Sequence, residues 1–138
     1  MSTDPTATVN AYFEAFGARD IDRILSFFAT DATWIVPGDE AVTPWVGRRT
    51  GPEDIGQFFT LFFQAAEPRA FEVFGMTQVS ADQVLVAGRF AYHFPGSGHD
   101  IDDEFVMRYT VDGGKITGFR IFEDSLGLAR AYTGEPVA

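Results

Sequence analysis

The stretch from residue 100 to residue 124, DIDDEFVMRYTVDGGKITGFRIFED, constrains the fold more than any other part of the chain. Two runs rich in alternating apolar residues flank the Asp-Gly-Gly sequence at 112–114. This pattern is typical of two antiparallel strands joined by a three-residue hairpin loop, with glycine in the left-handed position. If Val111 and Lys115 close the loop, the pairing of every other residue in the hairpin follows.

The predicted hairpin has one apolar face that ends in two carboxylates. Directly opposed residues point to the same face of a sheet, with Cβ atoms about 5 Å apart. On this face Met107 is expected opposite Phe119, Phe105 opposite Ile121, and Asp103 opposite Glu123.

A second hairpin is predicted just before the first. Residues 83–94 alternate in a way that indicates a strand with one buried face, and Pro-Gly-Ser-Gly at 95–98 is read as a four-residue loop. Closing that loop between Phe94 and His99 puts Phe90 opposite Asp103 on the apolar face. The opposite face then carries two pairs of opposite charge, Arg89 with Glu104 and His93 with Asp100. The pairings that follow from the two turns place the same residues of the shared strand on the apolar face, so they are compatible with one sheet.

The first half of the chain has helical periodicity instead. The pattern predicts a helix to about Ala18 that begins near Asp4–Thr6, a short helix that includes Phe28, a strand at 33–36 and a helix at 55–66. Further along, a strand is predicted at 70–79 and a last helix at 126–132.

Composition limits the classes of partner. The chain has 138 residues, which fits one domain, and a net charge of −10 with only 10 basic residues, so nucleic acid and membrane surfaces are poor candidates. Its 15 phenylalanines fill a core, line a cavity or cover a partner surface. The absence of cysteine and of a secretory N-terminus fits a cytoplasmic protein.

The order of these elements resembles that of the nuclear transport factor 2-like superfamily. The landmarks are AYFEAFGARDIDRILSFFATDATWIVPG near the start, GRRTGPEDIGQFF in the middle and DGGKITGFRIFEDSLGLARAY at the end. They are most similar to the branch that holds ketosteroid isomerases and polyketide cyclases of the SnoaL type. The resemblance implies an α+β fold, in which a curved antiparallel sheet wraps around N-terminal helices as a cone with an apolar pocket, often in a homodimer. A fold of this kind hosts many activities and does not name one.

Catalytic residues of the resembled families transfer only in part. The tyrosine of ketosteroid isomerases matches Tyr12, but the position of their general base is Val36 and that of their protonated aspartate falls near Phe105. The last-strand aspartate of limonene-epoxide-hydrolase-like members matches Ile121. Neither ketosteroid isomerase activity nor limonene epoxide hydrolase activity is therefore expected. Polyketide cyclases use an acidic pocket residue, a role open to Asp103 or Glu123.

The acid pair has two interpretations. If Asp103 and Glu123 face each other on an apolar surface, desolvation and repulsion raise the pKa of one of them, producing a proton acceptor near neutral pH. Tyr12 is then a candidate donor to the developing oxyanion. In the other interpretation, both acids lie solvated at the rim of the sheet.

The sequence therefore predicts a small-molecule enzyme with isomerase, cyclase or lyase chemistry, and its alternatives are a non-catalytic binder of a small hydrophobic ligand or a dimeric interaction module. No organic cofactor is implied, and the two histidines lack the spacing of a metal site. The residues expected to line the pocket are apolar or aromatic: Trp34, Phe58, Phe62, Phe90, Tyr92, Phe105, Met107, Phe119 and Ile121.

Overall fold

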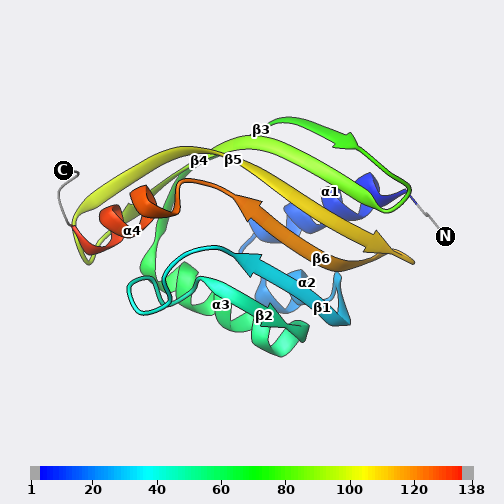
Figure 1. Cartoon of the computed structure of the whole chain (residues 1–138), viewed down its shortest axis with the longest axis horizontal. Helices are drawn as coiled ribbons and strands as arrows, with labels where there is room; N and C mark the ends of the chain where they lie inside the picture. Colours follow the sequence, from blue (N-terminus) through cyan, green and yellow to red (C-terminus); the bar gives the residue numbers. More distant parts are fainter. Residues whose placement is uncertain (1–3, 135–138) are drawn as a thin grey trace.

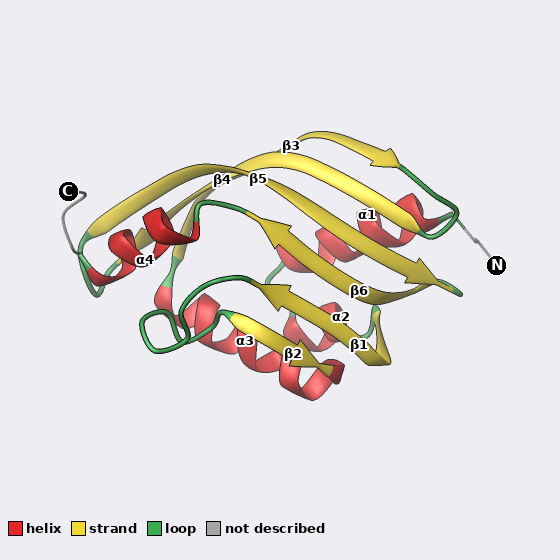
Figure 2. Cartoon of the chain, in the orientation of Figure 1, coloured by secondary structure: helices red, strands yellow, loops and turns green. Residues whose placement is uncertain are grey.

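The computed structural model describes residues 4–134, which form four helices and six strands within that range. Figure 2 shows their arrangement, in which α1–α3 lie on one side of a curved sheet and α4 lies at one end of it. The helices are α1 (Pro5–Gly17), α2 (Ile21–Leu25), α3 (Gly51–Ala65) and α4 (Ser125–Thr133). None of them is long and apolar enough to cross a membrane.

The sheet is mixed and open, with the strand order β2-β1-β6-β5-β4-β3. Its strands are β1 (Phe28–Val36), β2 (Gly47–Thr50), β3 (Glu67–Gln78), β4 (Gln83–Phe94), β5 (His99–Asp112) and β6 (Lys115–Phe122). The α+β cone is confirmed, but an entirely antiparallel sheet is not, because β1 runs parallel to β6. Strand β1 and strand β6 belong to distant parts of the chain, so no hairpin imposes an antiparallel pairing on them.

Local signals set most of the helix boundaries. Asp4, Asp20 and Asp124 act as N-caps whose carboxylates accept backbone hydrogen bonds in the first turns of α1, α2 and α4. The sequence prediction was wrong at Phe28, which begins β1 instead of ending α2. Its ring is 4 % exposed and packs edge-on against Tyr12, so burial of an aromatic side chain sets this boundary.

The pairing of β4 with β5 is confirmed along its whole length, from Phe94 opposite His99 to Gly88 opposite Phe105. On the outer face His93 pairs with Asp100, with 2.5 Å between Nδ1 and the carboxylate. Arg89 lies opposite Glu104 as predicted, but the expected ion pair between them does not form within residues 4–134. The Arg89 guanidinium binds Asp102 at 3.1 Å and also contacts a glutamate of β3.

The pairing of β5 with β6 differs from the prediction by two residues. Asp112 pairs directly with Lys115, so the turn contains only Gly113 and Gly114, whose φ angles are 58° and 78°. Positive φ at both central positions is the geometry of a type I′ hairpin. An irregularity between Thr110 and Val111 shifts the register by one more residue.

As a result, Met107 lies opposite Ile121 rather than Phe119, and Tyr109 takes the place opposite Phe119. The register prediction was therefore wrong, and Asp103 is not directly opposite Glu123, because β6 ends at Phe122 opposite Val106. A slip of two residues returns every side chain to the same face of the sheet. The inner face is therefore the predicted one.

The core lies between the concave face of the sheet and helices α1 and α3, as Figure 1 shows. Inner-face residues of β4 alternate with partly exposed ones, as expected for a strand with one buried face. Helix α3 contributes buried Ile55, Phe59 and Phe62, and α1 contributes buried Val9 and Tyr12. This arrangement brings aromatic rings from both layers into one cluster.

Candidate functional site

A cavity of about 60 Å³ lies inside the cone, between the sheet and the helices. Its walls are almost entirely apolar and come from α1, α3, α4, five strands and the segment between β1 and β2. The lining residues are Tyr12, Phe13, Phe16, Trp34, Val36, Trp45, Phe58, Phe59, Phe62, Phe71, Phe90, Tyr92, Met107, Tyr109, Phe119, Ile121, Glu123 and Leu128. An apolar cavity of about 150 Å³ admits benzene, so a ring-sized ligand requires movement of wall side chains here.

The structure places eight of the nine predicted wall residues around this cavity. The exception is Phe105, whose ring lies behind the wall, stacked between Phe71 at 5.4 Å and Phe90 at 5.7 Å. The absence of a side chain at Gly88 makes room for this ring, since a Cβ there would lie 2.8 Å from it. Phe105 is therefore a packing residue beneath the cavity wall.

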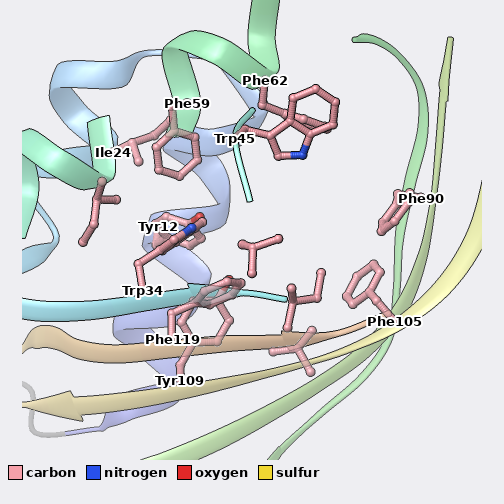
Figure 3. Packing of buried hydrophobic residues seen from close by; sticks show 14 of the residues in the cluster. Tyr12, Ile24, Trp34, Trp45, Phe59, Phe62, Phe90, Phe105, Tyr109 and Phe119 are labelled. Atoms are coloured by element: carbon pink, nitrogen blue, oxygen red, sulfur yellow. The ribbon is translucent and has the colours of Figure 1, made fainter. Parts of the chain in front are cut away.

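Trp34 forms one side of the cavity and is enclosed by rings. Its indole stacks on Phe119 at 4.0 Å and contacts Phe58 at 4.9 Å and Phe59 at 5.2 Å. Its Nε1 is buried and has no hydrogen-bond partner among residues 4–134. Figure 3 shows Trp34 within the buried aromatic cluster, beside Phe119.

Glu123 is the one charged side chain among the described residues that line the cavity. It follows β6 immediately and is half-buried. Burial, together with the nearby charges of Asp103 and Asp124, raises the pKa of its carboxyl from 4.5 to about 7. No hydrogen bond or ion pair within the described part of the chain holds the carboxylate, so it is free to exchange a proton with a ligand.

Asp103 does not line the cavity. Its Oδ2 accepts a hydrogen bond of 3.0 Å from the backbone N–H of Asp124, at the start of the last helix. Its negative charge is close enough to raise the pKa of Glu123. The structure thus separates the two acids that the sequence placed together: one faces the cavity, and the other anchors the segment that carries it.

Tyr12 is contributed to the cavity by α1. It is 3 % exposed, and its ring packs against Phe28 and Tyr109. Burial raises the pKa of its phenol above the ordinary value, and its hydroxyl shares a hydrogen bond with Tyr109. This places Tyr12 as a neutral hydrogen-bonding group within the core.

Tyr92 is the tyrosine that interacts electrostatically with Glu123. Burial raises the pKa of Tyr92, the positive charge of Arg19 opposes that rise, and the charge of Glu123 adds to it. The Tyr92 ring packs edge-on against Phe62 at 4.9 Å and lines the cavity. A neutral phenol near a titrating carboxyl is a donor beside a proton acceptor.

Several lining residues were missed at the sequence level. Tyr109 follows Met107 by two positions and so shares its face, a signal that the alternation of β5 contained. Phe13 and Phe16 also line the cavity, and their helical spacing with Tyr12 on α1 is a signal that the sequence contained. Trp45 comes from the segment between β1 and β2, for which no periodicity exists. It is 1 % exposed and packs on Phe62, Phe94 and Tyr132.

Within residues 4–134 no group of three or more histidine or acidic side chains is arranged to hold a metal ion. On the outer face, His93 pairs with Asp100 and Arg89 pairs with Asp102. The candidate site is therefore an apolar cavity with one carboxyl, three tyrosine hydroxyls and one indole N–H.

Comparisons with solved structures agree with this fold. An NTF2-like protein from Burkholderia xenovorans LB400 is 26% identical, with 93% of this chain and 95% of that chain aligned and a TM-score of 0.78. An NTF2-like protein of unknown function from Burkholderia pseudomallei K96243 is 22% identical, covers 96% and 99% of the two chains, and has a TM-score of 0.85. TerC co-crystallised with polyporic acid is 23% identical over 96% and 99%, with a TM-score of 0.75.

No curated protein matches the chain in a sequence search. The family model of the SnoaL-like domain matches residues 9–119, which extend from the first helix to the last strand. The match includes most of the cavity walls and stops just before Glu123. The chain belongs to the SnoaL-like family, within the NTF2-like superfamily.

Proposed function

We propose that the protein is an acid–base enzyme of isomerase, cyclase or lyase type that acts on a small, largely apolar molecule in this cavity. The observation that carries the proposal is Glu123, a carboxyl in an aromatic wall whose pKa is raised to about 7. A general acid or base is most effective when its pKa lies near the working pH. A carboxyl with the ordinary value would be a weaker base.

The chemistry that fits this group is removal of a proton from a carbon next to a carbonyl. The C–H bond breaks, its proton moves to the Glu123 carboxylate, and the electron pair is delocalised onto the carbonyl oxygen. Tyr92, the neutral phenol that interacts with Glu123, then donates a hydrogen bond to that oxygen. Return of the proton to a different carbon completes an isomerisation. In a cyclisation, the carbanion attacks a second carbonyl carbon, and the resulting alkoxide takes the proton back from Glu123.

Binding requires the cavity to enlarge. At about 60 Å³ it does not accommodate a ring in its present shape. The lining residues that are only partly buried are the candidates for displacement: Phe13, Phe16, Phe58, Phe71 and Met107. A ligand that enters this way shields Glu123 further from water, which raises its pKa in the complex.

The proposal is tested with 1-tetralone, a two-ring ketone that has acidic hydrogens next to its carbonyl. In D₂O, NMR is expected to show exchange of these hydrogens at a rate that rises with pH around a midpoint near 7, as Glu123 loses its proton. Glu123→Gln is expected to slow the protein-dependent exchange by roughly 100-fold or more.

The matched control is Asp103→Asn, which keeps an oxygen to accept the Asp124 N–H but removes the neighbouring charge. It is expected to retain exchange with the midpoint moved to lower pH. Binding of 1-tetralone without any exchange would instead assign the cavity to a non-catalytic ligand-binding protein. Exchange that survives Glu123→Gln unchanged would exclude Glu123 as the base.

We also propose that the protein is a homodimer. The supporting observation is an exposed apolar and cationic patch on the outer face of β5 and β6, where Val106 is 38% exposed and Phe122 is 44% exposed.

A further inference from the structure

The Trp34 indole is the least explained polar group of the cavity. Its side chain is 2 % exposed, and its Nε1 has no hydrogen-bond acceptor among residues 4–134. A buried donor without an acceptor costs about 1–3 kcal/mol, so such groups are uncommon unless they have a function. A phenylalanine would fill the same aromatic site without that cost.

The neighbouring hydroxyls do not supply the missing acceptor. Tyr12 and Tyr109 share a hydrogen bond with each other, and the Tyr109 hydroxyl also contacts the sulfur of Met107 at 3.4 Å. The surroundings of Trp34 are otherwise phenylalanine rings. No oxygen among residues 4–134 accepts a hydrogen bond from this N–H in the structure, so water or a ligand is left to supply the acceptor.

We propose that Trp34 Nε1–H is a recognition group that binds the carbonyl oxygen of the ligand, at the inner end of the cavity. This inference rests on the proposed function only in that both place the ligand in the same cavity. It deepens that function by naming the ligand class: a flat apolar molecule that carries a hydrogen-bond acceptor at the end remote from Glu123. An aliphatic or aromatic hydrocarbon would leave the donor unpaired and bind less well.

The separation of Trp34 from Glu123 sets the length of that molecule. Trp34 is the partner of Phe119 in the pairing of β1 with β6, and the two rings stack at 4.0 Å. Glu123 follows Phe119 by four residues, which is about 13 Å of extended chain. One carbonyl group cannot reach both ends. The acceptor held by Trp34 and the carbon deprotonated by Glu123 are therefore at opposite ends of an elongated ligand.

The test compares two ligands of the same shape, 1-tetralone and tetralin, which differ by the carbonyl oxygen. Titration calorimetry of the wild-type protein is expected to show a preference of roughly threefold to tenfold for the ketone, since one hydrogen bond replaces another made to water. In Trp34→Phe this preference is expected to disappear, while the affinity for tetralin changes by less than about twofold. A preference that persists in Trp34→Phe overturns the proposal, as does failure of 1-tetralone to bind the wild-type protein.

A second measurement on the unmodified protein does not depend on folding of the variant. The chain has 2 tryptophans, so ¹H–¹⁵N spectra contain two indole signals. Addition of 1-tetralone is expected to shift the signal of the Trp34 indole proton downfield. Tetralin, which has no hydrogen-bond acceptor, is expected not to produce this downfield shift. Equal shifts with both ligands overturn the proposal.

The two proposals fail separately. Since 1-tetralone has one carbonyl, exchange comes from molecules bound with that carbonyl beside Glu123, the orientation that Trp34→Phe leaves open. Loss of the ketone preference in Trp34→Phe, with no exchange in either the wild-type protein or this variant, supports the recognition role and contradicts the enzyme. Exchange that requires Glu123, together with an unperturbed Trp34 indole signal, supports the enzyme and contradicts the recognition role.

Discussion

At the scale of single residues, Glu123 shows a conflict between stability and function. Its carboxyl is partly withdrawn from water, lies near two other acids and forms no compensating hydrogen bond within residues 4–134. In the unfolded chain such a carboxyl ionises at about 4.5, whereas in the folded protein it ionises at about 7. The folded state thus holds a proton more tightly, and the ionised form is unfavourable for folding.

This linkage predicts that Glu123→Gln stabilises the protein at alkaline pH. Below about pH 4 both states are protonated and the substitution should have little effect. As the pH rises from 4.5 through 7 the wild-type protein loses stability that the variant keeps. At about pH 8 the gain should reach 1–3 kcal/mol, since each pKa unit corresponds to about 1.4 kcal/mol. Urea denaturation at the two pH values measures the difference, and a gain that is independent of pH would contradict the raised pKa.

The sequence predicted which apolar residues line the cavity, but it did not predict which of the two acids faces it. Alternation along β5 and β6 placed Met107, Phe119 and Ile121 on the inner face, and eight of nine predicted residues line the cavity. The alternation did not show that Glu123, and not Asp103, lines the cavity. That distinction depends on where β6 ends and on the hydrogen bond from the Asp124 N–H to Asp103. Neither feature has a periodic signal.

At the scale of elements, the hairpin of β5 and β6 shows why faces are easier to predict than register. The period of two fixes the face of each residue, and an even slip leaves it unchanged. The register depends on the turn, and Asp-Gly-Gly fits both a three-residue loop and the two-residue turn that forms. The segment between β1 and β2 was unpredictable for another reason: Trp45 is fixed by packing against Phe62 and Phe94, which are remote in sequence.

The turn geometry predicts different effects at its two glycines. Gly114 has a φ angle of 78°, and a β-branched side chain is strained in this region. Gly114→Val should therefore destabilise the protein by about 1–2 kcal/mol. Gly113→Asn is the matched control, because its φ of 58° suits asparagine at the first position of a type I′ turn. Urea denaturation should show little change for Gly113→Asn, and equal losses at both positions would argue against this turn type.

At the scale of the whole molecule, the outer face of the sheet is the part least explained by the fold itself. Arg108 and Arg120 are directly opposite each other on β5 and β6, although the chain has a net charge of −10. Neither arginine forms an ion pair within residues 4–134, and both guanidinium groups lie over the exposed ring of Phe122, at 5.8 and 4.8 Å. Like charges opposed across two strands are unfavourable, so a negatively charged partner would stabilise the pair of Arg108 and Arg120.

A second copy of the chain meets that requirement under twofold symmetry. In a pairing of outer faces, Phe122 and Val106 of each copy form the apolar centre, and Glu104, which is exposed and lacks an ion pair within the described residues, supplies the negative charge for the arginines. Sedimentation velocity is expected to show a dimer for the wild-type protein and a monomer for Phe122→Ser. Phe74→Ser is the matched control, because Phe74 is 57% exposed on β3 at the edge of the sheet and should leave the dimer intact. A monomeric wild-type protein, or a dimer that dissociates only with Phe74→Ser, would contradict this pairing.

Retention of ligand binding in the cavity of the Phe122→Ser monomer would then show that each copy contains a complete site.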